Sequence, residues 1–130
     1  MTTEEKIQYW LDIADYDLDT AEAMYKTGRW LYVAFMCHQV IEKTLKAYWC
    51  KTQSEDAPYT HNLILLANQS GLADMMSDEQ NLFLARIMPM NIAARYPSYK
   101  DQLSKMLDKN TCRLIIDNTQ QLQVWIKNKL

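Results

Sequence analysis

The chain has 130 residues, a formal net charge of −2 and 48% hydrophobic residues. This length suits one domain, residues 1–130, with a hydrophobic core. Only two glycines and three prolines occur, which argues against a β-rich fold, and the negative charge argues against a protein that mainly coats nucleic acid. The charge is uneven, because residues 1–25 are mainly acidic and residues 86–113 mainly basic. These segments could attract each other or present two surfaces of opposite sign.

A first helix is predicted to begin at Thr2 or Thr3, where a hydroxyl cap precedes two glutamates. Apolar residues then repeat at helical spacing up to Tyr25, and Gly28 supplies a left-handed helix end. A second helix is predicted over 30–52, where no glycine or proline occurs. Because the link is so short, the two helices should be antiparallel.

The helix over 30–52 is apolar around much of its girth, which predicts that it is the central helix of a bundle. One polar strip interrupts this pattern, formed by Gln39, Glu42, Lys43 and Lys46 at positions i, i+3, i+4 and i+7. Two interpretations remain open at this point. The strip is either a solvated face on which Glu42 pairs with Lys46, or the polar wall of a binding groove.

Residues 53–60 are predicted to form a loop, after which Thr60 caps a short helix that ends at Gly71. His61 would lie in the first turn of this helix and have a structural role. Another helix should follow the Ser77 and Gln80 capping box, restart at Pro89 and end at Pro97.

A last helix is predicted over about 108–127. The pattern therefore predicts an all-α fold, an up-and-down antiparallel bundle of four main helices plus one short helix.

Arg95 is followed by Tyr96 and Tyr99 at the end of one predicted helix. A guanidinium beside aromatic rings suits phosphate binding and base stacking. The alternative is structural, with Arg95 bridging helix carbonyls and Tyr96 filling the core.

The three cysteines are odd in number and lack the close spacing of a metal or redox pair. We therefore expect reduced thiols, no metal and no cofactor. Neither a signal peptide nor a membrane span is predicted, so we expect a cytoplasmic protein.

Together these positions resemble the HEPN family, the small helical domains named for nucleotide binding in higher eukaryotes and prokaryotes. The resemblance covers about residues 10–97. It is carried by Trp10, Ala14, Asp17, Leu18, Ala21, Trp30, Ala34, Phe35, Gln39, Glu42, Lys43, Leu45, Lys46, Ala47, His61, Leu63, Leu66, Arg95, Tyr96 and Pro97.

The resemblance implies a helical bundle that is often dimeric. It also implies an association with nucleotides, RNA or a nucleotidyltransferase partner, commonly in toxin–antitoxin or defence systems. Active HEPN ribonucleases are similar in having a histidine after the arginine, with four to six residues between the two. Here Lys100, Asp101 and Gln102 follow Arg95 at those places, and no histidine follows His61. Because histidine is the side chain best suited to move a proton near neutral pH, catalysis is not expected.

Our preferred hypothesis is a non-catalytic binding module without catalytic residues. Its groove would hold a nucleotide or RNA, or dock a nucleotidyltransferase, and would be lined by Gln39, Glu42, Lys43, Lys46, Arg95 and Tyr96. One alternative is a metal-independent ribonuclease toxin. Another is a structural dimerisation module without ligand, in which Arg95 and Glu42 form a buried or interfacial ion pair. A homodimer is expected from the resemblance and from the twelve tryptophans and tyrosines.

Overall fold

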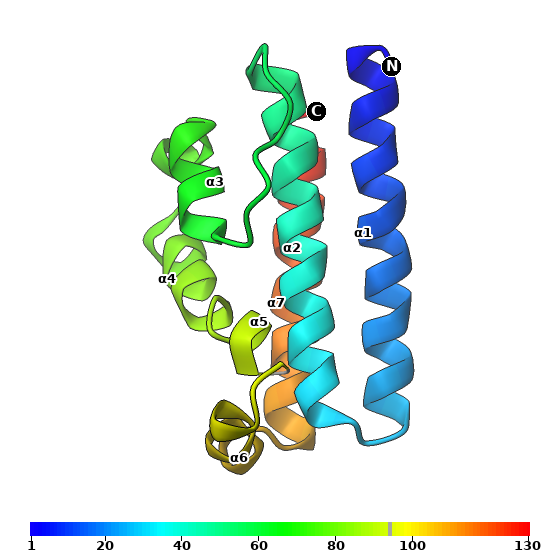
Figure 1. The fold of residues 1–130 in the computed structure, drawn as a ribbon, viewed down its shortest axis with the longest axis vertical. Helices are drawn as coiled ribbons and strands as arrows, with labels where there is room; N and C mark the ends of the chain where they lie inside the picture. The colour runs from blue at the N-terminus through cyan, green and yellow to red at the C-terminus, as the bar shows by residue number, and fades with distance from the viewer. Residues whose placement is uncertain (94) are drawn as a thin grey trace.

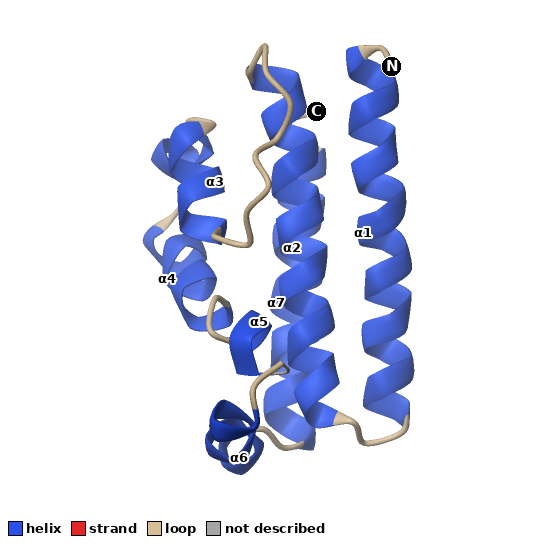
Figure 2. Cartoon of the chain, viewed as in Figure 1, coloured by secondary structure: helices blue, strands red, loops and turns tan. Residues whose placement is uncertain are grey.

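The computed structural model describes residues 1–93 and 95–130, and these residues form helices and their connections only (Figure 2). In chain order the elements are α1 (Thr3–Lys26), α2 (Trp30–Thr52), α3 (Leu63–Gln69), the 3₁₀ helix η1 (Leu72–Met75), α4 (Asp78–Ile87), α5 (Met90–Ala93), α6 (Pro97–Met106) and α7 (Lys109–Lys127). The long helices α1, α2 and α7 run side by side, and the shorter helices α3 to α6 lie across α2 from α1 (Figure 1). The predicted all-α bundle is confirmed.

Helices α1 and α2 form the predicted antiparallel hairpin (Figure 1). The hydroxyl of Thr2 accepts a hydrogen bond from the backbone N–H of Glu5 at 3.1 Å, which satisfies one free donor of the first turn. At the other end Gly28 has a φ of 72°, a conformation that glycine adopts without steric cost. The turn between the two helices is therefore encoded locally.

The hydrophobic core surrounds α2, as predicted for a central helix. Val33, Cys37, Ile41 and Leu45 are completely buried on this helix. They pack within one cluster that includes side chains of α1, α3, α4 and α7. Burial of such side chains is the main stabilising contribution, roughly 2 kcal/mol each.

Ion pairs join the first and last helices. Arg113 Nη2 lies 2.8 Å from Glu22 Oε1, and Lys127 Nζ lies 2.7 Å from Asp15 Oδ1. Attraction between the acidic first helix and the basic later segment is thus confirmed for Arg113.

The start of α3 differs from the prediction. Asn62, rather than Thr60, caps the helix, because its side-chain oxygen accepts the N–H of Leu65 at 3.0 Å. The Thr60 hydroxyl instead accepts the N–H of Asn62. Asparagine is the stronger capping residue. His61 therefore precedes the helix instead of lying in its first turn.

The second difference concerns Pro97. The preceding helix α5 already ends at Ala93, and Pro97 begins α6, a helix that was not predicted. Proline suits a first helical position, where a backbone N–H would have no helical partner. The capping box of Ser77 and Gln80 is confirmed, with both of its hydrogen bonds formed.

The cysteines Cys37, Cys50 and Cys112 are unpaired and buried. Across the part of the chain that the structure describes, no helix combines the length and apolar character needed to cross a membrane.

Candidate functional site

The polar strip of α2 is covered by other parts of the chain. Glu42 is completely buried, and Gln39 and Lys46 are also buried. The interpretation of the strip as a solvated face is therefore wrong. Helical spacing places these four side chains on one face, but it carries no information about what packs over that face.

The carboxylate of Glu42 is the centre of a charged network. Its Oε2 accepts hydrogen bonds from Lys43 Nζ at 2.8 Å and from Lys46 Nζ at 3.2 Å. Its Oε1 lies 2.7 Å from Nδ1 of His61, a distance at which the ring N–H donates to the carboxylate. The predicted pairing of Glu42 with Lys46 is confirmed. We call Gln39, Glu42, Lys43, Lys46 and His61 the Glu42 cluster.

Burial alone raises the pKa of the Glu42 carboxyl, because it disfavours the charged form. The hydrogen bonds from Lys43 and His61 and the two lysine charges outweigh that effect, so the pKa lies below its usual value. Glu42 is therefore a carboxylate at neutral pH. A buried carboxylate needs such partners, since leaving it unpaired in a protein interior costs several kcal/mol.

Neighbouring helices hold the cluster in place. Gln39 Oε1 accepts from Lys43 Nζ at 3.2 Å, and Gln39 Nε2 donates to Asn91 Oδ1 of α5 at 3.3 Å. From α1, the ring of Trp10 lies under Lys46 Nζ, 5.2 Å from its centroid. Asp17 of α1 is near enough to be influenced by Lys43 and Glu42; burial raises its pKa, and Lys43 opposes that shift.

His38 borders the Glu42 cluster and is completely buried. Burial lowers the pKa of its imidazole to about 4, and the nearby Glu42 charge opposes this effect only partly. Its Nδ1 lies 3.4 Å from Gln39 Nε2, and among the described residues its Nε2 has no hydrogen-bond partner. His38 is thus neutral near pH 7.

Arg95, in the link between α5 and α6, lies against the same side of α2 through its contact with Phe35. Its guanidinium carbon is 5.9 Å from the centroid of the Phe35 ring, within the range of a cation–π contact. Phe35 precedes Gln39 by one helical turn. Arg95 is exposed to solvent.

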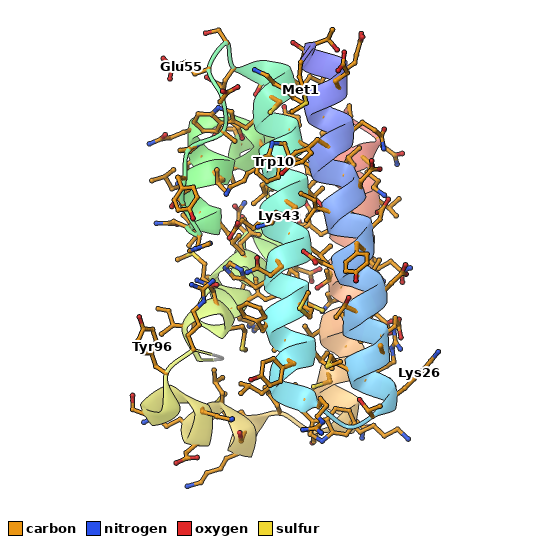
Figure 3. All side chains as sticks on the ribbon, turned by 45° about the vertical axis from the view of Figure 1, so that its right-hand side comes forward. Met1, Trp10, Lys26, Lys43, Glu55 and Tyr96 are labelled. Atoms are coloured by element: carbon orange, nitrogen blue, oxygen red, sulfur yellow. The ribbon has the colours of Figure 1, made fainter. Side chains whose placement is uncertain are left out.

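The ring of Tyr96 does not fill the core. It is 56% exposed, and Figure 3 shows it turned outward at the link between α5 and α6. The structural alternative for Tyr96 is therefore wrong. The side chain of Tyr99 lies outside the described residues.

The structure divides the predicted site residues into two groups. Gln39, Glu42, Lys43 and Lys46 form one hydrogen-bonded cluster, whereas Arg95 and Tyr96 lie beside it at the surface. Within residues 1–93 and 95–130 the ion pairs of Glu42 are intrahelical or involve His61. The proposed buried pair between Arg95 and Glu42 is not formed inside the chain.

The surface around the Glu42 cluster has an excess of positive charge. Lys43, Lys46 and Arg95 carry three positive charges, and Glu42 neutralises one of them; Lys46 and Glu42 are buried, so Lys43 and Arg95 are the cations of this group that reach solvent. Asp17 is a nearby acid; burial raises its pKa, and Lys43 opposes that shift. In the view of Figure 3 the labelled Trp10, from α1, and Lys43, from α2, lie one above the other. An anionic group is the natural complement of such a surface.

The described residues do not provide a metal site. Among the described residues, the structure brings together no group of three or more histidines, cysteines or acidic residues that could hold a metal ion. The ammonium donors of the cluster, Lys43 and Lys46, instead suit an anion.

A family model described as the HEPN domain matches residues 7–129, almost the whole chain. The protein belongs to the HEPN family. Its fold is also similar to that of TT1696 in the crystal structure of that protein from Thermus thermophilus, with a TM-score of 0.78 and 18% sequence identity. That similarity covers 96% of this chain and 98% of the other. A comparison with curated proteins gave no match.

In this HEPN domain two members of the site, His61 and Asn91, were not predicted from spacing. His61 is nineteen positions from Glu42, and Asn91 is fifty-two positions from Gln39. No local pattern reports contacts over such separations. The resemblance did include His61, and that was the one signal in the sequence that linked it to α2.

Proposed function

We propose that this HEPN domain is a non-catalytic module that binds a nucleotide or a segment of RNA at the α2 face formed by the Glu42 cluster, Arg95 and Tyr96. The family to which the chain belongs is associated with nucleotides, which supports this class of ligand.

The observation that carries the proposal is the local excess of positive charge on a protein with a net charge of −2. Glu42 fixes the ammonium groups of Lys43 and Lys46 and the ring of His61 by hydrogen bonds. The two fixed ammonium groups lose little conformational entropy when an anion binds. Arg95 adds a planar guanidinium with five donors, a geometry that suits phosphate.

The length of the face favours an oligonucleotide over a mononucleotide. Arg95 lies over the ring of Phe35. Phe35 and Lys43 are eight residues apart on α2, which is roughly 12 Å along the helix axis. Separate phosphate groups can engage the two ends. The exposed ring of Tyr96 offers a surface on which a base can stack, worth roughly 1–3 kcal/mol.

The test is a fluorescence-anisotropy titration of a labelled single-stranded RNA of about twelve nucleotides, with ATP as competitor. We expect Arg95→Ala and Lys43→Ala each to weaken binding about tenfold and to lower the salt dependence by about one counterion. Arg29→Ala is the matched control, because Arg29 is also an exposed arginine but lies at the turn between α1 and α2. Equal binding by the wild type and both site variants contradicts the proposal.

One observation favours a second candidate, metal-independent RNA cleavage. The ring of His61 is 41% exposed and is oriented by the buried carboxylate of Glu42. A carboxylate-oriented imidazole can act as a general base. If the titrated RNA is shortened by the wild type but not by His61→Ala, this candidate replaces the non-catalytic one.

The proposal extends to the setting in which the module works. We infer a nucleotidyltransferase partner, within a toxin–antitoxin-like or defence system, from family membership. Recovery of a nucleotidyltransferase with the tagged protein under native expression supports this inference, and its consistent absence from such preparations contradicts it.

A further inference from the structure

A hollow of about 210 Å³ lies beside the last turns of α2, beyond the Glu42 cluster. Figure 1 shows its surroundings, where the first turns of α1 lie next to the end of α2 and the loop that follows it. The hollow is smaller than the roughly 300–1,000 Å³ of a pocket for a drug-sized ligand, so its size suits a single ring system. Its lining includes residues from all three segments: Lys6, Tyr9, Trp10, Cys50, Asp56 and Ala57.

The hollow is continuous with the charged face of α2. Lys43, Lys46 and Cys50 are at positions i, i+3 and i+7, so they share one face of the helix. Trp10 joins the two regions, because its ring centroid lies 5.2 Å from Lys46 Nζ and the same side chain borders the hollow. Cys50 is roughly 10 Å from Lys43 along the helix axis. A strand whose phosphate contacts Lys43 therefore has a base within reach of the hollow.

Two aromatic rings border the hollow. Tyr9 and Trp10 pack edge to face, with centroids 5.2 Å apart and planes at 72°. Tyr9 is 49% exposed. Among the described residues, neither ring belongs to the hydrophobic cluster around α2, so core packing does not account for them. Aromatic surfaces beside a hollow suit a nucleobase, which stacks on such rings.

An ion pair at the same hollow provides directional hydrogen-bonding groups. Lys6 Nζ donates to Asp56 Oδ1, although the two residues are fifty positions apart in the chain. The Asp56 side chain is 80% exposed, and exposed ion pairs contribute little to stability. A carboxylate has two oxygens and an ammonium has three hydrogens, so both groups keep the capacity to bind a ligand while they are paired.

This ion pair matches the edge of one base. Guanine carries two adjacent donors, N1–H and the N2 amino group, which complement the two oxygens of the Asp56 carboxylate. Its O6, next to N1, is an acceptor for the Lys6 ammonium. Adenine, cytosine and uracil each lack two adjacent donors on their Watson–Crick edges, so they form fewer of these bonds.

We propose that the hollow is a guanine subsite for RNA bound along the α2 face. Tyr9 and Trp10 contact the plane of the base, and Lys6 and Asp56 contact its edge. This inference rests on the proposed function, because a phosphate of the strand must lie at Lys43 for the base to reach the hollow. It adds a base preference that the charged face alone does not provide, since phosphate contacts carry no sequence information.

The experiment compares labelled twelve-nucleotide RNA strands by fluorescence anisotropy. One strand is oligouridine, and the others carry a single guanosine or a single inosine, placed at either end or in the middle. The wild type should bind the best guanosine strand about tenfold more tightly than oligouridine. Inosine lacks the N2 amino group, so the affinity for its strand should fall between the two.

Asp56→Asn should abolish the preference for guanosine, because its amide offers one acceptor oxygen in place of two. Asp19→Asn is the matched control, since it makes the same charge change at an exposed aspartate more than two turns beyond Trp10 on α1. The control should keep the preference, and the two variants should bind oligouridine equally. Tyr9→Ala tests the stacking and should weaken binding of the guanosine strand at least about fivefold.

Three results overturn the proposal. They are equal affinity of the wild type for the guanosine and uridine strands, a guanosine preference that persists in Asp56→Asn, and equal affinity for GMP and for the guanosine strand. The last result would assign the hollow to a free nucleotide. In each case RNA binding that Arg95→Ala still weakens leaves the proposed function standing, whereas a failure of every strand to bind overturns both claims.

Discussion

Replacing Glu42 by glutamine keeps the shape of the side chain and removes the charge at the centre of the cluster. The two lysines then lose their counter-ion and His61 loses a carboxylate acceptor, while Lys46, 7% exposed in its side chain, remains inside the protein. Removing one partner of a buried ion pair typically costs about 3–5 kcal/mol. The amide oxygen still accepts one hydrogen bond and His61 retains contact with water, so we expect the lower end, about 3 kcal/mol.

The measurement is urea unfolding followed by far-ultraviolet circular dichroism, together with thermal unfolding. For a chain of 130 residues, a loss of about 3 kcal/mol corresponds to a midpoint lower by roughly 10 °C. Lys46→Met should cost about 1 kcal/mol, since methionine can occupy the same space against Trp10.

The double variant Glu42→Gln/Lys46→Met provides the control. It has neither the buried carboxylate nor the buried ammonium, so its loss should be about 2 kcal/mol smaller than the two single losses added together. A loss below about 0.5 kcal/mol for Glu42→Gln, or strictly additive variants, would refute the view that Glu42 organises this face.

Three further predictions concern buried or constrained residues. Because burial lowers the pKa of His38 to about 4, the unfolded chain binds a proton at this site below about pH 6.5 whereas the folded chain does not. The free energy of unfolding should therefore fall as the pH drops from 6.5 to 4, by at most about 1.4 kcal/mol per pH unit. The urea midpoint of His38→Gln should fall less steeply over this range than that of the wild type. An equal slope for the two proteins would contradict the reasoning. Cys37, whose pKa is raised to about 12 by burial, should resist alkylation at pH 8 until urea unfolds the protein, and rapid labelling of the native state would argue against its burial. Gly28→Ala should destabilise the protein by about 1 kcal/mol, because the position has a positive φ that alanine adopts only with strain. A steric clash does not contribute, since the added Cβ would meet Trp30 at an ordinary 3.7 Å. A neutral effect in thermal unfolding would show that the turn relaxes.

Local signals predicted the hairpin and the bundle because these depend on local chemistry. Helical spacing of apolar residues, the Thr2 cap and the left-handed position of Gly28 each act within a few residues. The same local view could not assign Pro97, because a proline that ends one segment is equally suited to begin the next helix. It also misplaced His61, since Thr60 and Asn62, the capping residues on either side of it, compete for one helix start.

The proposed binding face was harder to predict for a different reason. The spacing of Gln39, Glu42 and Lys43 shows that they share a face, but the covering groups come from distant parts of the chain. His61 and Asn91 reach α2 only through the tertiary fold. A polar strip on an otherwise apolar helix is therefore compatible with solvent exposure and with a buried network alike, and only contacts distinguish the two.

The most direct test of the central claim is an NMR titration of ¹⁵N-labelled protein with the same twelve-nucleotide RNA. The account predicts that shifts concentrate in α2 between Phe35 and Lys46, at His61 and at Arg95 and Tyr96, with α4 and α7 little affected. An absence of shifts at saturating RNA, or shifts confined to α4 and α7, would contradict the assignment of nucleotide or RNA binding to the face around Glu42.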